Sequence, residues 1–417
     1  MPKQPAPLRI LNGASSPRPR NPFEYGRELA PGELADRTDE VEQARSAMLE
    51  GRKLFIIGPR RYGKTSILRA AELGAIAAGA IVFRYDVSAF PSVDSLTARL
   101  AADAALAFAG STDRVVRVVK DLFGALRPTV SIDVDSGAPT ISFGGDRASE
   151  RSKPIPLLTD VLDGIERAAS KHNGSVAVVL DEFQELLGSG GVKAGVKAGM
   201  KVEEQIRATV QRHRHVGYVF AGSKTRLLIE MTTTHGRPFF NLGDRRFLGP
   251  VPRPDFIALL SKGFADGDIV VLEGALDEIL SRAEDVPYTV QLLARACWDT
   301  CRAGAAAGEQ PLVLTPALVA SVHERVAREQ DPNFSTAWEK LTLPQRAALR
   351  ALIYTGGIGL ASAEVSRRYH ISVSTMQTSL GALKDQEILR DELSGGVTHL
   401  RFEDPLFSAW IRFFIQP

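Results

Sequence analysis

Apolar runs alternate with helix-length amphipathic segments through the first half of the chain. Four short runs rich in β-branched residues are almost continuously apolar, as expected for strands that are buried on both faces. They are Lys53–Ile57, Ile81–Asp86, Ser175–Leu180 and Val216–Gly222. Because long helical patterns separate them, the sequence predicts an α/β fold, a parallel sheet covered by helices on both sides.

Two stretches depart from this alternation. Between Thr129 and Phe143, two segments of alternating polarity flank an Asp-Ser-Gly-Ala-Pro turn, which predicts a β-hairpin inserted into the sheet domain. The stretch Gly188–Lys201 repeats Val-Lys-Ala-Gly and is rich in lysine, so we expect a mobile basic loop there.

The second half of the chain is mainly helical in pattern. After about Pro250 the strand patterns fade, and from about Leu341 three helical segments precede two short strands around a Gly-Gly turn. This last order is that of a winged helix-turn-helix. We therefore predict a flexible tail at 1–20, an α/β core at 21–250, a helical lid subdomain at 251–340 and a winged-helix domain at 341–417.

The segment Gly58–Thr65, GPRRYGKT, carries the strongest chemical signal, because it matches the phosphate-loop pattern between a strand and a helix. Backbone N–H groups of such a loop surround phosphates, and its glycines allow close approach. Lys64 would neutralise the β and γ phosphates, and the Thr65 hydroxyl would coordinate magnesium. The predicted nucleotide-binding residues are Gly58, Pro59, Arg60, Arg61, Tyr62, Gly63, Lys64, Thr65 and Ser66.

An acidic pair and a serine follow two other predicted strands. Asp181 is predicted to hold the magnesium hydration shell, and Glu182 to orient and polarise the attacking water. The competing interpretation is that both cap the next helix. Ser223 is predicted to meet the γ-phosphate or that water, although an ordinary strand-to-helix cap fits it as well. The glutamate favours hydrolysis over nucleotide binding alone.

Seven segments together resemble the archaeal-type ATPase family, within the AAA+-related STAND group and similar in architecture to Orc/Cdc6 initiators. They are NPFEYG (21–26), ADRTDEV (35–41), GPRRYGKTS (58–66), LDEFQEL (180–186), FAGS (220–223), VPYTVQLLA (286–294) and FEDPLFSAWIR (402–412). The resemblance covers nearly the whole chain. It implies a P-loop parallel-sheet ATPase core, a helical lid and a C-terminal winged helix, with ATP and magnesium as cofactors.

The resemblance also implies further site residues. Asp36 and Arg37 would lie beside the nucleotide base, and Pro287 would approach the nucleotide from a lid helix. The chain departs from the family at Asp285, since Asp-Val-Pro replaces the usual Gly-x-Pro. It departs again before Arg245 and Arg246, either of which would serve as an arginine finger toward a neighbouring subunit; a surface arginine is the alternative.

Composition narrows the class of protein. With 44% hydrophobic and 24% charged residues among 417, the chain is neither disordered nor fibrous. It has no apolar run near the roughly 20 residues of a spanning helix and no signal-peptide core, so we expect a cytoplasmic protein with no membrane contact. Cys297 and Cys301, its two cysteines, cannot form a disulfide framework or a zinc site by themselves.

The leading functional hypothesis is a magnesium-dependent ATPase that acts as a STAND-type switch, in which ATP frees or reorients the winged helix. The alternative is an ATP-dependent DNA-binding protein, initiator-like or related to transposition; a small-substrate phosphotransferase fits less well. Lys340–Pro417 has nine basic against seven acidic residues, which leaves DNA and a protein partner equally open. A homo-oligomer is a further expected partner state.

Overall fold

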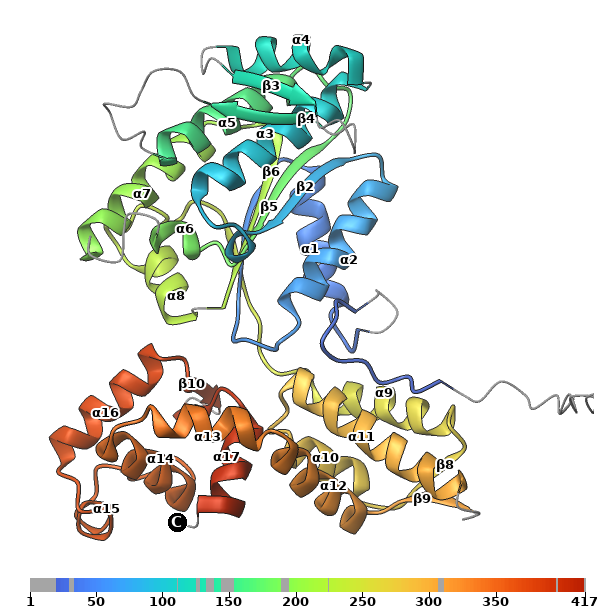
Figure 1. Cartoon of the computed structure of the whole chain (residues 1–417), viewed down its shortest axis with the longest axis vertical. Helices are drawn as coiled ribbons and strands as arrows, with labels where there is room; N and C mark the ends of the chain where they lie inside the picture. The colour runs from blue at the N-terminus through green and yellow to red at the C-terminus, as the bar shows by residue number, and fades with distance from the viewer. Residues whose placement is uncertain are drawn as a thin grey trace, which may run out of the picture.

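The computed structural model divides into a sheet domain and two helical parts. It describes residues 20–29, 34–110, 112–124, 128–132, 139–143, 154–188, 195–223, 225–306, 311–394 and 397–415. In Figure 1 the sheet and its helices lie at the top, with the lid helices and the C-terminal helices side by side beneath them. Apart from Arg20, the predicted tail lies outside the described residues.

Five parallel strands form the central sheet, in the order β2-β5-β6-β1-β7. They are β1 (Lys53–Ile57), β2 (Ile81–Asp86), β5 (Val176–Asp181), β6 (Val216–Gly222) and β7 (Asp244–Phe247). The four predicted runs are all strands, and the parallel α/β sheet is confirmed. The sequence pattern missed β7, a short edge strand of mainly exposed residues.

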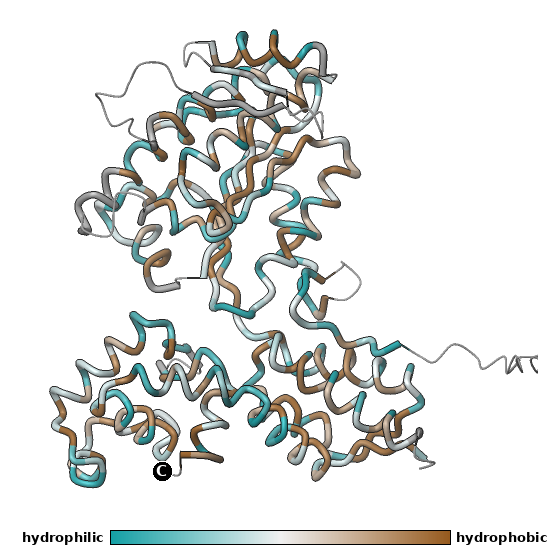
Figure 2. Tube along the Cα trace, viewed as in Figure 1, coloured by the Kyte–Doolittle hydropathy of each residue, from teal (hydrophilic) through white to brown (hydrophobic). Residues whose placement is uncertain are grey.

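Helices cover both faces of the sheet, as the apolar runs require. Every residue of β5 and β6 is buried, and Figure 2 shows these central strands as a hydrophobic band. One face packs on α1 (Thr38–Leu49) and α2 (Lys64–Ala77). The other packs on α3 (Val93–Ala109), α5 (Pro154–Ala169) and α7 (Gly195–Val210). Short elements complete this domain: η2 (Val87–Ala89), α4 (Thr112–Phe123), α6 (Glu185–Gly188) and α8 (Thr225–Thr233).

The predicted hairpin is confirmed. Strands β3 (Pro128–Ile132) and β4 (Pro139–Phe143) pair antiparallel, with Val130 opposite Ile141, and pack near α3 and α4. The turn between them lies outside the described residues. Figure 1 places the hairpin at the end of the sheet domain that is far from the C-terminal helices.

The prediction of a loop over Gly188–Lys201 is wrong for its second half. Helix α7 begins at Gly195, and residues 189–194 lie outside the described part. The helix extends because Val202, Ile206 and Val210 are all buried at helical spacing, and alanine, lysine and methionine before them are good helix formers. The Val-Lys-Ala-Gly repeat concealed this start.

The lid consists of helices and one small parallel strand pair. Its helices are α9 (Arg253–Ala265), α10 (Ala275–Arg282), α11 (Pro287–Ala306) and α12 (Pro316–Glu329), and its strands are β8 (Ile269–Val271) and β9 (Leu312–Leu314). Cys297 and Cys301 are buried in α11, and burial raises the pKa of the Cys297 thiol to about 12. They are therefore unreactive core residues.

Helix α13 (Asp331–Glu339) leads from the lid into the C-terminal part. Three helices and a two-stranded antiparallel sheet follow in the predicted order, and a short helix and a π-helical turn end the described part of the chain. They are α14 (Leu343–Thr355), α15 (Ala363–Tyr369), α16 (Val373–Asp385), β10 (Leu389–Ser394), β11 (Val397–Phe402), α17 (Pro405–Trp410) and η4 (Ile411–Ile415). We call residues 341–415 the C-terminal module.

One hydrophobic cluster runs without interruption from the lid into the C-terminal module. It includes Phe256 of α9, Trp338 of α13 and Trp410 of α17, and it also takes in Phe23 from the N-terminal segment. The predicted boundary at 340 thus does not separate two hydrophobic cores. Among the described residues, no helix is long and apolar enough to cross a membrane.

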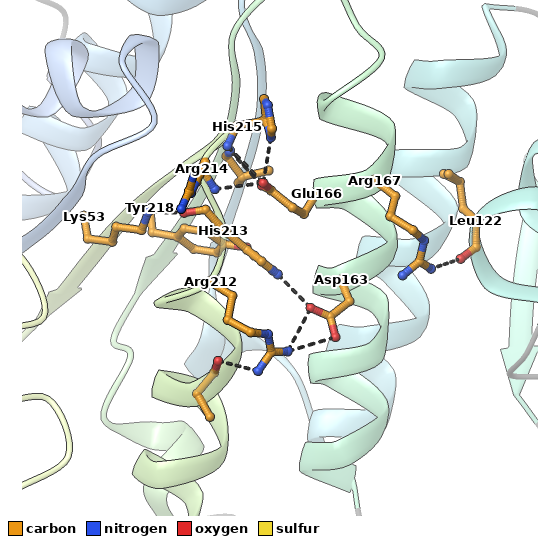
Figure 3. Close-up of polar contacts among 12 residues, drawn as sticks. Lys53, Leu122, Asp163, Glu166, Arg167, Arg212, His213, Arg214, His215 and Tyr218 are labelled. Atoms are coloured by element: carbon orange, nitrogen blue, oxygen red, sulfur yellow. Dashed lines mark hydrogen bonds and ion pairs between the residues drawn. The ribbon is translucent and has the colours of Figure 1, made fainter.

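A polar network fastens the amino-terminal ends of the strands, opposite the phosphate loop (Figure 3). The carboxylate of Glu166 on α5 accepts hydrogen bonds from three backbone N–H groups, at positions 214 to 216. His213 lies 2.8 Å from Asp163 and 2.7 Å from the fully buried Tyr218 hydroxyl. The turn between α7 and β6 is therefore held to the sheet by side chains.

We predict that Tyr218→Phe lowers the free energy of unfolding by about 1–3 kcal/mol, because it removes a buried hydrogen bond and leaves the Nδ1 atom of His213 without its partner. Urea denaturation of the variant and the parent measures this. The exposed Tyr354 provides a matched control, since Tyr354→Phe removes a hydroxyl that is open to solvent. Equal stability of Tyr218→Phe and the parent would contradict the structural role of the network.

Candidate nucleotide-binding site

The parallel register brings the predicted site residues to one edge of the sheet. Ile57 pairs with Gly222 and Asp86 pairs with Asp181, so the phosphate loop, the acidic pair and Ser223 all follow strands that end together. Ligands of open α/β sheets bind at this carboxyl-terminal edge.

The phosphate loop has the backbone shape that its glycines permit. Gly63 has φ +84, in the left-handed region, immediately before α2 begins. A Cβ atom at Gly58 would lie 2.7 Å from the Leu248 Cβ, so no larger residue fits there. The loop thus turns tightly between β1 and α2, with the amino end of α2 facing the cleft.

Lys64 is buried under its own loop. Its Nζ donates to the carbonyl oxygens of Gly58 at 2.9 Å and Pro59 at 2.8 Å. Burial lowers the pKa of Lys64, while the charges of Glu182 and Asp181 act in the opposite direction. An anion in the loop would supply further opposite charge, so the site favours a phosphate beside this ammonium group.

Thr65 and Asp181 meet at the predicted magnesium position. The Thr65 hydroxyl donates to Asp181 Oδ2 at 2.8 Å. Burial raises the pKa of Asp181, and the hydrogen bond from Thr65 opposes that rise. A hydroxyl and a carboxylate are hard oxygen ligands of the kind that magnesium binds beside nucleotide phosphates, so these two residues fit the ion.

Glu182 is held by two neighbours in a strained conformation. Its φ is 50, which is uncommon for a residue other than glycine. Its Oε2 accepts from the Gln184 side chain and from the Ser223 hydroxyl, the latter at 2.8 Å. Burial acts to raise the pKa of Glu182, but these hydrogen bonds and the charge of Lys64 outweigh it and lower the pKa. The carboxylate is therefore ionised at neutral pH, as a general base must be.

Ser223 thus lies at the site, and its hydroxyl is hydrogen-bonded to Glu182. Its backbone N–H also points to the same carboxylate oxygen, at 3.3 Å. The predicted contact with the γ-phosphate or the attacking water is untested by this geometry. The arrangement gives Ser223 a direct part in orienting Glu182.

A cleft of about 410 Å³ opens beside the loop, within the range of small-ligand pockets. Its phosphate end is formed by the loop and Glu182. Its other end has apolar and aromatic walls suited to a base, formed by Tyr25, Leu29, Leu34, Ala35, Val251, Phe256, Pro287 and Tyr288. Arg37 and Pro287 line the cleft, whereas Asp36 is not among the described residues that border it.

The N-terminal segment and the lid close over this cleft. Phe23 packs on Phe264 of α9, with ring centroids 4.8 Å apart, and the Leu29 N–H donates to the Ser66 hydroxyl at 3.0 Å. The Tyr288 N–H donates to the Arg61 carbonyl at 3.3 Å, which joins α11 directly to the phosphate loop. Lid position and loop conformation are therefore linked.

Both candidate arginine fingers lie on β7 and contact their own chain. Arg245 donates to the Thr232 carbonyl oxygen at 2.6 Å, and Arg246 lies 3.3 Å from Glu40. A role toward a neighbouring subunit stays a prediction. It would require these contacts to open.

The middle of the phosphate loop is bound by the C-terminal module. The Arg60 N–H donates to Glu403 at 2.9 Å, and the Arg60 guanidinium lies 2.6 Å from Glu387. The Arg61 guanidinium lies 2.5 Å from Asp404. We call these three contacts, one hydrogen bond and two ion pairs, the latch.

A buried pair reinforces the latch. Arg390 of β10 donates to the Tyr62 hydroxyl at 3.1 Å and lies over its ring, 5.5 Å from the centroid. Tyr62 is only 2% exposed, and burial raises its pKa to about 12. Tyr62, which follows Arg61 and precedes Gly63 in the loop, is thus part of the interface with the module.

Sequence reasoning missed the residues that carry this interface. Glu403 and Asp404 stood inside the FEDPLFSAWIR segment, but no local pattern indicated that they would meet Arg60 and Arg61. Gln184, which holds Glu182, stood within LDEFQEL. Tyr25 and Tyr288 lie in the segments NPFEYG and VPYTVQLLA, but nothing else in the sequence indicated that they would line the cleft.

Comparison with known proteins supports this fold. The Walker-type ATPase PABY2304 of Pyrococcus abyssi matches with a TM-score of 0.57 at 15% identity, over 94% of this chain and 100% of that chain. The ORC2 protein of Aeropyrum pernix, in its ADPNP-ADP complexes, matches with a TM-score of 0.50 at 14% identity, over 95% and 99%. No family model and no curated protein matches the sequence. The expected likeness to Orc-like and Walker-type ATPases is confirmed at the level of fold.

We predict that Lys64→Ala abolishes measurable binding of magnesium and ATP, because it removes the one buried ammonium group that the loop holds against the phosphates. Fluorescent ATP-analogue titration of the purified chain measures this. Lys262→Ala, in which an exposed lysine is removed from the lid, is the control. Parental affinity in Lys64→Ala would show that the nucleotide lies elsewhere.

Proposed function

We propose that this chain is a magnesium-dependent ATPase that acts as a switch, in which ATP bound at the phosphate loop changes how the C-terminal module sits on the core. The observation that carries the proposal is the latch. The segment that would cradle the phosphates is the same segment that the module binds through Glu387, Glu403 and Asp404.

Electrostatics makes these two uses of the loop antagonistic. The Glu403 carboxylate accepts a hydrogen bond from the Arg60 N–H of the loop, and its negative charge acts to raise the pKa of Lys64. Burial raises the pKa of Glu403, which Arg390 and the Arg60 N–H oppose. A triphosphate brought against the loop would repel this carboxylate at short range. ATP binding therefore favours separation of the module from Arg60 and Arg61.

The chemistry of hydrolysis rests on groups already in position. Thr65 and Asp181 would hold the magnesium ion, which supplies charge neutralisation for the β and γ phosphates. Lys64 adds a fixed positive charge, and Glu182 accepts a proton from the attacking water. Gln184 and Ser223 keep that carboxylate aimed and ionised. Arg37 and Pro287 would bound the base, whereas Asp36 does not border the cleft and has no contact with the base in this proposal.

Glu182→Gln tests hydrolysis separately from binding. We expect turnover to fall by on the order of a hundredfold with ATP affinity nearly unchanged, since the amide keeps the shape but cannot accept a proton. Steady-state phosphate release and analogue titration measure the two quantities. An equal loss of both would assign Glu182 to metal binding or folding instead.

Glu403→Gln tests the latch. The substitution keeps the size of the side chain but removes its charge, so we expect ATP to bind about 5- to 20-fold more tightly, less than a full charge-assisted hydrogen bond is worth. Asp404 is a poorer choice, because its carboxylate also caps α17 through the Leu406 N–H.

The matched control is Glu364→Gln, which makes the same charge change at an exposed position on α15 of the same module. ATP affinity should match the parent in the control. An unchanged or weaker affinity in Glu403→Gln would contradict antagonism between module and nucleotide.

The DNA-binding alternative gains little from α16, the helix that would enter a groove. Its exposed side chains include Ser374, Thr375, Gln377 and Thr378, which carry no charge. Lys384, its one basic residue, lies 3.0 Å from Asp391. Because DNA affinity depends on phosphate contacts, we expect weak, salt-sensitive binding of duplex DNA by the full-length chain. Tight, sequence-selective binding with ATP would favour the alternative.

A further inference from the structure

A second cleft lies away from the phosphate loop, between the lid and the end of the chain. It has a volume of about 330 Å³, with α10, α12 and the α10–α11 connection on one side and α17 and η4 on the other. Its lining is unusually rich in charged groups for a junction between helices. Arg282, Glu284, His323 and Arg412 decide its chemistry.

His323 lies in the wall of this cleft and carries a hydrogen-bond donor that no described residue uses. Its side chain is 5% exposed, and its Nδ1 lies 3.1 Å from the Arg282 guanidinium. A guanidinium only donates, so Nδ1 accepts and the proton of the neutral ring is on Nε2. Nε2 has no hydrogen-bond partner among the described residues. Burial and the charges of Arg282 and Arg412 lower the pKa of His323 to about 4, which keeps the ring neutral at pH 7.

Arg412 supplies the positive charge. It lies in the π-helical turn η4 and is exposed to solvent, and its guanidinium forms no ion pair or hydrogen bond with the residues that the structure describes. Turns of this type often occur at functional sites. Arg282, by contrast, is already paired with Glu278 at 2.8 Å. Arg412 is therefore the free cation of the described lining.

Two carboxyl groups of the lining, Glu278 and Glu284, argue against an anion. Glu278 is paired with Arg282, and the surroundings of Glu284 weaken the objection that remains. The Glu284 Oε2 is buried without a partner, and burial raises its pKa despite Arg401, Arg390 and Arg412. The raised pKa makes the neutral carboxyl, which can donate a hydrogen bond, less costly here than at an exposed position. Glu284 and Asp285 also have φ values of 48 and 55. Two consecutive residues, neither of them glycine, thus have the left-handed backbone conformation. Strain of this kind persists where the surroundings fix a side chain in place.

We propose that this cleft binds a small oxyanion, a phosphate or carboxylate group, between Arg412 and the His323 Nε2–H. The ligand would satisfy a buried donor that the protein leaves unpaired and would neutralise Arg412. Because His323 belongs to the lid and Arg412 to the C-terminal module, it would also join the two parts. This proposal does not depend on nucleotide binding at the phosphate loop.

The test uses the full-length chain carrying Lys64→Ala, which weakens anion binding at the phosphate loop. Inorganic phosphate and succinate are titrated separately by calorimetry at constant ionic strength, set with chloride. We expect one saturable site for at least one probe and a rise in unfolding temperature with that probe, as for any ligand of the folded state. Preference for phosphate or for succinate identifies the source of the oxyanion.

Three substitutions decide whether the bound probe is in this cleft. Arg412→Gln should weaken binding at least tenfold, Glu284→Gln should tighten it severalfold by removing a negative charge, and Arg325→Gln should leave it unchanged. Arg325 lies on the same helix as His323 but pairs with Glu329 at the surface. Absence of saturable binding of both probes, or binding that Arg412→Gln does not weaken, would overturn the proposal.

Discussion

The contact between Glu403 and the Arg60 N–H links the two halves of the molecule, and the rest of the account depends on it. In the proposed function, one side of the loop Gly58–Thr65 would carry the nucleotide chemistry through Lys64 and Thr65. The other side carries Arg60, Arg61 and Tyr62, which the C-terminal module covers. Because one short loop serves both surfaces, a charge placed on it is felt on both sides without any long pathway through the protein.

The lid adds a second mechanical connection. Its hydrophobic cluster continues into the C-terminal module and includes Phe23, while the Tyr288 N–H reaches the Arg61 carbonyl. The module therefore cannot move as a domain on a loose tether. A change at the loop must either break the latch while the lid and module move together, or shear the shared cluster. The first route leaves the larger hydrophobic area buried and is the one that the packing favours.

The sequence predicted the sheet well because buried parallel strands leave a strong apolar signature. Strands β1, β2 and β6 begin and end where the pattern placed them. The phosphate loop and the acidic pair followed from local motifs next to those strands. Edge strand β7 and the start of α7 were not predicted. The residues of β7 are mainly exposed and give no apolar signal, and a glycine-containing repeat obscures the helical pattern at the start of α7.

Contacts between distant segments were beyond local patterns altogether. The latch joins residues more than 300 positions apart, and only the fold shows that Glu403 meets Arg60. The most direct test of the central claim is amide hydrogen exchange of the full-length chain with and without Mg-ATP. The account predicts faster exchange in β10, β11 and the segment before α17 when ATP binds, with no such change in Lys64→Ala. Slower or unchanged exchange there, with ATP demonstrably bound, would contradict it.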